Sequence, residues 1–189
     1  MVPTPAVYGA HMVKVPTAVS RTPKNRNYLS QFGFRLVIMR APNIEFYVQS
    51  CNVPSISLPE APQATPFVEI PRPGDHLRFG QLDITYKVDE DLKNYDEIRK
   101  WMFALGKPTD FHEYEKIEKE PEWTGRGVTS DMSLVILNGV KQANYETVFS
   151  DAWPTELGEL RFETTDDDVE YITGSASFRF TVFDVKKTH

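Results

Sequence analysis

The residues of this 189-residue chain that could carry acid–base or nucleophilic chemistry are few and scattered. Its four histidines stand far apart in the sequence, at His11, His76, His112 and His189. Cys51, the single cysteine, has no histidine near it in sequence that could activate its thiol. No glycine-rich phosphate loop and no G-x-S-x-G motif occurs in the chain. We therefore predict no catalytic residues, no bound cofactor and no enzyme activity.

Two acidic runs raise the question of a calcium site. They are Asp89-Glu90-Asp91 and Asp166-Asp167-Asp168. Neither is followed by the glycine and glutamate spacing of an EF-hand loop. The first run precedes an expected helix, whose positive N-terminal end favours negative charge, and the second suits a turn. We therefore predict no metal ligands in this chain.

Alternating apolar and polar residues predict β-strands over most of the chain. The expected strands cover residues 34–39, 44–50, 81–88, 132–137, 145–149, 161–164 and 171–185, and the first two resemble a hairpin. One amphipathic helix is expected after Asn94, which forms a capping-box pattern with Glu97, and it ends at Gly106. These elements predict a mainly β fold: an antiparallel β-sandwich or partly closed barrel with one flanking α-helix.

Residues 1–28 differ in composition from the rest and predict an extended N-terminal arm. They contain four prolines and no acidic residue. Their four basic residues are Lys14, Arg21, Lys24 and Arg26. Because the whole chain carries −6 and this arm +4, the expected β domain, residues 29–189, carries −10. Such a segment cannot build a core, so it is either a disordered tail or an arm that docks on an acidic neighbouring subunit.

Two segments of the β domain are expected to lie outside its core. Residues 54–76 contain six prolines, among them Pro59, Pro66 and Pro71, which predict a long extended loop and exclude a central strand. Long ordered loops are usually functional, and here the function would be to reach a partner. Residues 107–127 are charged and rich in turn residues, which predicts a surface insert.

The overall charge and the apolar pattern exclude several classes of partner. A net charge of −6 disfavours binding to nucleic acid phosphates. No apolar run approaches the length of a membrane span, and the first twenty residues lack the pattern of a signal peptide. One cysteine cannot form an internal disulfide. We therefore expect a protein that is made in a cytoplasm and contacts no membrane.

Trp153 and Pro154 open the most specific motif of the chain. Trp153-Pro154-Thr155, a gap of two residues and then Gly158-Glu159-Leu160 resemble the Trp-Pro-Thr-x-x-Gly-Glu-Leu signature of tail tube proteins from T-even-like contractile phages. Residues 46–54 resemble the second strand of that family and its proline turn, and residues 83–101 resemble its strand, acidic turn and helix. A tryptophan fixed by a following proline is either a core plug or an interface anchor.

The resemblance implies a virion structural protein. Its subunits would form six-fold rings that stack into the tail tube, the channel for DNA ejection. The implied partners are other copies of the chain, sheath, baseplate or neck proteins, and viral DNA that passes without specific binding. The protein would be assembled in the host cytoplasm and located in the tail of the virion. We expect the assembly contacts at Lys14, Arg21, Lys24, Arg26, Pro59, Pro66, Pro71, Trp153 and Pro154.

Two other functions fit the same residues. The long arm, the 54–76 loop and the 107–127 insert leave open a tube-fold paralog, either a baseplate tube initiator or a neck or tail-completion protein. The second alternative is a β-sandwich that binds carbohydrate or peptide through aromatic residues such as Tyr114 and Trp123.

Overall fold

A computed structural model of the chain describes residues 28–29, 33–106, 111–112, 114–115, 119, 128–163 and 171–188. The basic residues of the N-terminal arm and most of the 107–127 insert lie outside these ranges. The elements are β1 (Phe34–Ile38), β2 (Val48–Cys51), β3 (Ile56–Ser57), β4 (Glu60–Ala64), β5 (Glu69–Pro73), β6 (Arg78–Phe79), β7 (Leu82–Lys87), α1 (Lys93–Gly106), β8 (Ser130–Leu137), β9 (Ala143–Leu157), β10 (Thr173–Arg179) and β11 (Val182–Lys187).

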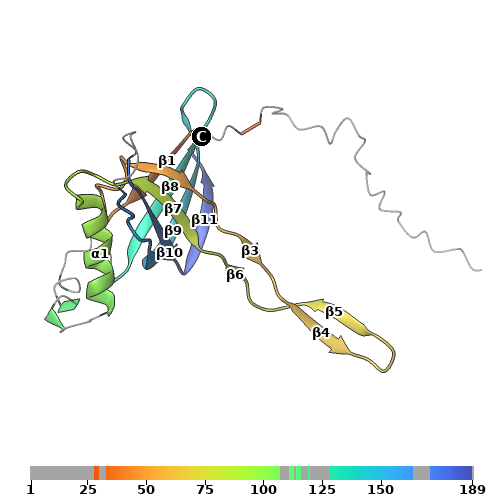
Figure 1. Cartoon of the computed structure of the whole chain (residues 1–189). Helices are drawn as coiled ribbons and strands as arrows, with labels where there is room; N and C mark the ends of the chain where they lie inside the picture. Colours follow the sequence, from red (N-terminus) through yellow and green to blue (C-terminus); the bar gives the residue numbers. More distant parts are fainter. Residues whose placement is uncertain are drawn as a thin grey trace, which may run out of the picture.

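The body is one antiparallel sheet of seven strands with α1 on its flank (Figure 1). The strands follow the order β1-β8-β9-β10-β7-β2, and β11 pairs with β9. This path begins at β1 and ends at β2, and these two strands do not pair with each other. The expected mainly β, antiparallel architecture with a flanking helix is therefore confirmed, as a sheet that does not close into a barrel.

Strand β9 joins the two halves of this sheet. Its first half pairs with β8 on one side and β11 on the other, and its second half pairs with β10. Asp151 has a φ of 53° at the point where the partners change. Pro154 pairs with Phe178 next to a register shift between Ser177 and Phe178. A proline is tolerated there because such an irregularity interrupts the ladder of hydrogen bonds.

Alternation along β7 and the apolar stripe of α1 build the core. Leu82, Ile84 and Tyr86 are buried on one face of β7, as expected from the sequence. Trp101 of α1 packs against Phe178 with ring centroids 6.2 Å apart, and its indole nitrogen donates to the carbonyl of Val128 at 2.9 Å. The helix therefore covers one face of the sheet with a tryptophan whose polar atom is satisfied.

The start of α1 differs from the expected capping box. Asn94 is fully buried, and its amide donates to the carbonyl of Lys87 at 2.8 Å, so it ties the helix to the end of β7. Glu97 accepts hydrogen bonds from the backbone and side chain of Asn43 instead of reaching back along the helix. Burial raises the pKa of Glu97, and the bonds from Asn43 partly offset that effect.

Four expected strands differ from the observed ones. Residues 34–50 do not form a hairpin, because β1 pairs with β8 and β2 pairs with β7, and residues 44–47 of the expected strand 44–50 lie in turns. The expected strand at 161–164 is wrong for residues 161–163, which have no regular structure. The expected long strand at 171–185 is divided at Phe180 and Thr181 into β10 and β11, which pair with different halves of β9.

The proline-rich segment 54–76, expected as an extended loop with a possible short edge strand at Phe67–Ile70, forms a protruding β-ribbon. Strand β3 pairs with β6, and β4 pairs with β5, which carries the chain away from the body (Figure 1). Pro62 and Pro71 face each other across the ribbon. A two-stranded ribbon accepts prolines because each strand needs partners on one side only.

Candidate functional site

The ribbon arm, residues 55–80, is the candidate contact surface because it protrudes from the body (Figure 1). Every residue of β4 and β5 is exposed. An isolated two-stranded ribbon is marginally stable in water, so an arm of this kind needs support at its base or from a partner. At the joint between β3 and β4, the amide of Gly74 donates to the carbonyl of Pro59 at 2.8 Å.

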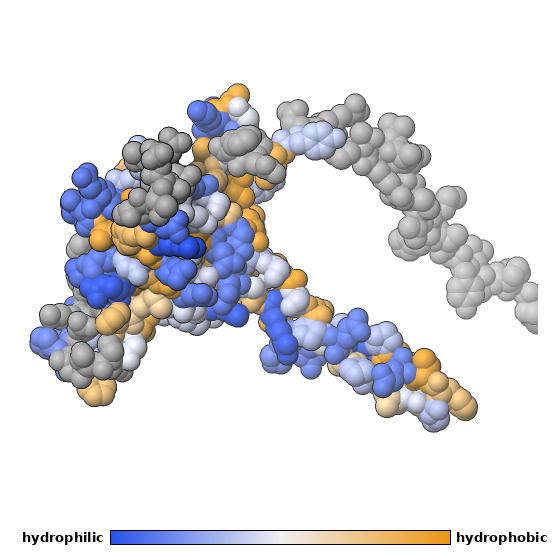
Figure 2. Space-filling view, in the orientation of Figure 1, coloured by the Kyte–Doolittle hydropathy of each residue, from blue (hydrophilic) through white to orange (hydrophobic). Residues whose placement is uncertain are grey.

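The tip of the ribbon arm presents apolar side chains to solvent. Phe67 is 98% exposed and Val68 follows it, and Figure 2 shows apolar residues gathered at the end of the arm. Thr65 fixes the turn, because its hydroxyl donates to the carbonyl of Val68 and accepts from the amide of Val68 at 3.2 Å. A rigidly held, exposed phenylalanine is typical of an interface anchor.

The residues that the sequence singled out for assembly lie in three places. Pro59, Pro66 and Pro71 lie together on the ribbon arm. Trp153 and Pro154 lie in β9, where Pro154 is buried and Trp153 packs half-buried against the core. The four basic residues of the N-terminal arm lie outside the described residues.

Four phenylalanines hold the root of the ribbon arm on the body. Phe79 of β6 lies 5.8 Å from Phe180 and 5.5 Å from Phe183, measured between ring centroids. Phe149 of β9 lies 5.0 Å from Phe180 and completes the cluster. Arg179 also donates to the carbonyl of Phe79 at 3.2 Å. The arm is therefore anchored through side chains of β9, β10, β11 and the β10–β11 turn.

Replacing Phe79 by alanine is expected to loosen the arm. The lost ring contacts should lower the free energy of unfolding by about 2 kcal/mol, below the usual cost for a fully buried phenylalanine because Phe79 is half-buried. Hydrogen exchange should accelerate in residues 55–80 more than in β8 or β9. Phe46→Ala is the matched control, since Phe46 is 82% exposed. Equal exchange rates in the two variants would contradict the anchoring.

Within the part of the chain that the structure describes, three strands leave an edge open. β1 and β2 end the strand path, and β11 pairs only with β9. Val182 and Val185 of β11 are about half exposed. Open edges with apolar side chains favour pairing with another chain.

The thiol of Cys51 is less ionised than an ordinary cysteine thiol and therefore a poorer nucleophile. Burial, together with the nearby Asp83 carboxylate, raises the pKa of Cys51 to about 12. The thiolate is the nucleophile, so at pH 8 the reactive fraction is about a thousandfold smaller than for an ordinary thiol. Among the described residues, no three or more His, Cys, Asp or Glu side chains gather in a way that could hold a metal ion. In the same part of the chain, no helix has the length and apolarity to cross a membrane.

The raised pKa predicts slow alkylation of Cys51. At pH 8 the folded protein should react with iodoacetamide about a thousandfold more slowly than the protein in concentrated guanidinium chloride. Raising the pH toward the pKa should increase the folded-state rate, because more thiolate forms. A Val140→Cys variant in a Cys51→Ser background is the control and should react rapidly, since Val140 is 72% exposed. Rapid alkylation of folded Cys51 would contradict the prediction.

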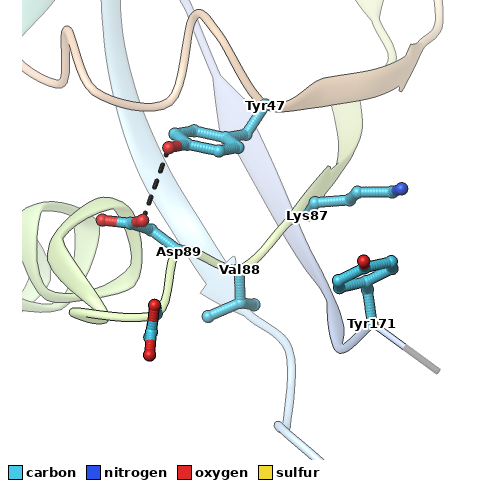
Figure 3. A pocket seen from close by; sticks show the side chains of 6 residues that line it. Tyr47, Lys87, Val88, Asp89 and Tyr171 are labelled. Atoms are coloured by element: carbon cyan, nitrogen blue, oxygen red, sulfur yellow. Dashed lines mark hydrogen bonds between the residues drawn. The ribbon is translucent and has the colours of Figure 1, made fainter. Parts of the chain in front are cut away.

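A groove lies at the end of β7 that is far from the ribbon arm. It encloses about 410 Å³ and is lined by Tyr47, Lys87, Val88, Asp89, Glu90 and Tyr171 (Figure 3). The Tyr47 hydroxyl donates to Asp89 at 3.4 Å, and the Lys87 ammonium lies 4.8 Å from the centre of the Tyr171 ring. The sequence reasoning missed this groove, because its residues come from three separate segments.

Comparison with known proteins identifies the fold. No profile of a protein family matches the chain. The chain is 27% identical over 143 residues to the tail tube terminator protein of Enterobacteria phage T4, an alignment that covers 74% of this chain and 76% of that protein. The tube terminating cap of the anti-feeding prophage superposes with a TM-score of 0.58 and 13% identity, over 91% of this chain and 100% of that one.

The chain has the fold of the tube proteins of contractile injection systems. A chain of the 6-fold symmetrised anti-feeding prophage baseplate also superposes, with a TM-score of 0.56 and 11% identity over 86% of this chain and 97% of that one. The resemblance carried by the Trp153-Pro154-Thr155 motif is therefore confirmed. In this tube-fold protein, Trp153-Pro154-Thr155 lies in β9 just after Asp151, where the strand changes partners.

Proposed function

We propose that this tube-fold protein is a structural component of a contractile tail that forms a ring and closes the end of the tail tube. The observation that carries the proposal is the 27% identity to a tail tube terminator over 143 residues. The likeness to a tube terminating cap over the whole of that chain supports it. Of the alternatives left open by the sequence, the neck or tail-completion protein is favoured over the main tube subunit and over the baseplate initiator.

The open edges support the ring. Edges β1 and β2 lie at the two ends of the strand path, and β11 offers a third. When different edges of two identical copies pair, the contact is head-to-tail, and repeated rotation closes it into a ring. We propose six copies, as the tail tube resemblance implies.

The ribbon arm and the charge support contacts along the tail axis. An arm with a rigid apolar tip can reach a neighbouring ring of tube, sheath or neck subunits. Residues 29–189 carry −10, which would disfavour adhesion of DNA to a channel formed by the ring. The proposed role is structural, with no catalytic step.

The number of copies in a tail tests this proposal. Quantitative mass spectrometry of purified tails should give one ring of this chain, about six copies, against many copies of the sheath subunit. A main tube subunit would instead be as abundant as the sheath, and a ligand-binding module would be missing from washed tails. Either of these two results would contradict the terminating ring.

A further inference from the structure

The groove at the end of β7 is held rigidly from both sides. The amide of Lys87 donates to the carbonyl of Tyr47 at 2.9 Å, and the amide of Val88 donates to the carbonyl of Ile172 at 2.9 Å. Tyr47 and Tyr171 are therefore fixed on opposite sides of the same strand end, with Val88 between them (Figure 3). This arrangement presents two aromatic walls over an apolar floor.

Carboxylates lie at one end of the groove. Asp89 and Glu90 precede α1, and Glu90 has no ion pair among the described residues. Lys87 is the one cation among the six lining residues, and its ammonium points away from Asp89 toward the Tyr171 ring (Figure 3). The carboxylate end of the groove thus favours a positively charged group.

Aromatic walls next to carboxylates suit a basic segment that contains proline. Extended proline-containing peptides dock in grooves lined by aromatic residues, because their shape is already fixed before binding. A polyproline helix has three residues per turn, so positions i and i+3 face the same side about 9 Å apart. An arginine at i+3 could pair with a carboxylate while the proline packs between the tyrosines.

The N-terminal arm contains one such pair. Pro23 is followed three residues later by Arg26, and no other proline among the first 28 residues has a basic residue at that spacing. Arg21 and Lys24 flank Pro23, and the whole arm contains no acidic residue that would be repelled by Asp89 or Glu90. We propose that the groove binds residues 21–26 of a neighbouring copy, with Pro23 between Tyr47 and Tyr171 and Arg26 on the Asp89–Glu90 carboxylates.

This docking rests on the proposed assembly of several copies, but it can be tested without tails. The receptor is the full chain with Arg21→Ala, Lys24→Ala and Arg26→Ala, so that its own arm does not compete. Its ligand is a fluorescent peptide of residues 18–28, and binding is followed by anisotropy. Saturable binding that weakens with added salt is expected.

Substitutions in the groove decide the result. Glu90→Gln and Tyr171→Ala in the receptor should each weaken peptide binding at least about fivefold. Glu60→Gln is the matched control, since Glu60 is exposed on the distant ribbon arm and should leave binding unchanged. In the peptide, Pro23→Ala and Arg26→Gln should have effects similar to those of the groove variants. Absence of binding, or equal binding by the Glu90→Gln and Glu60→Gln receptors, would overturn the proposal.

A mixing experiment shows which copy supplies the arm. Two variants in a Cys51→Ser background, one with Asn25→Cys and one with Asp91→Cys, keep Arg26 and Glu90 and should form a disulfide-linked dimer when mixed and oxidised. A third variant carries all three substitutions in one chain. If the mixed dimer does not form and this third variant forms only an intramolecular disulfide, docking on a neighbouring copy is overturned. Tail copy number does not enter either experiment, so each can fail while the terminating ring stands.

Discussion

Phe67→Asp at the tip of the ribbon arm is expected to remove the protein from tails without unfolding it. The side chain is 98% exposed and makes no contribution to the core, so the melting temperature should stay within a few degrees of the parent. Burying a charge in a partner's apolar site should cost at least about 2 kcal/mol, which weakens binding roughly 30-fold. Incorporation is measured by adding the purified variant to tails assembled without the protein.

The control for the tip variant is Val140→Asp. Val140 is an exposed apolar residue on the turn between β8 and β9, at a different end of the body from the ribbon arm (Figure 1). It should be incorporated like the parent. A stronger version replaces residues 60–73 by Asn-Gly, which suits a tight turn between Pro59 and Gly74 because their backbones are already hydrogen-bonded. Normal incorporation of this shortened protein would show that the arm is not an assembly contact.

Removal of residues 1–28 is expected to impair assembly far more than folding. The buried core begins at Leu36, so the arm adds no buried residue to it among the described ones. Loss of four positive charges opposite a body of −10 should weaken contacts between copies at least about tenfold at low salt. Analytical ultracentrifugation of the truncated and full chains at two salt concentrations measures the effect.

A variant without the four positive charges separates the effect of the arm's charge from the effect of its length. Lys14→Ala, Arg21→Ala, Lys24→Ala and Arg26→Ala together should reproduce most of the loss while the arm keeps its length. If the truncated protein unfolds outright, the arm belongs to the fold and its assignment to assembly is wrong. If both variants associate like the parent, the charge argument fails.

Local patterns predicted the parts of the fold that depend on one element at a time. The alternation of Leu82, Ile84 and Tyr86 placed the buried face of β7 correctly, and the stripe through Ile98 and Trp101 placed the buried face of α1. These patterns succeed because the period of an element fixes which of its side chains share a face.

Local patterns could not predict which strands pair with each other. The apolar alternation continues from β10 into β11, but the chain changes partners at Phe180 and Thr181, and β9 changes partners at Asp151. Strands β1 and β2 follow each other in sequence and yet lie at the two ends of the strand path. Alternation records burial and carries no information about which strand lies alongside.

The sequence predicted part of the ribbon arm and none of the groove. Proline density at 54–76 indicated a segment that reaches outward, but the pairing of Pro62 with Pro71 in a ribbon depends on the whole arm and has no local signal. The groove was missed because Tyr47, Asp89 and Tyr171 are brought together only by the pairing of β7 with its two neighbours. Residues that gather through long-range pairing leave no spacing rule in the sequence.

The shape of the assembled protein tests the central claim most directly. Six copies of the 21.7 kDa chain have a mass of about 130 kDa, which light scattering distinguishes from a monomer. Negative-stain microscopy should show single rings with a central hole, either free or seated on the ends of tubes that lack the protein. Particles that remain monomeric at high concentration and never form a ring at a tube end would contradict the account.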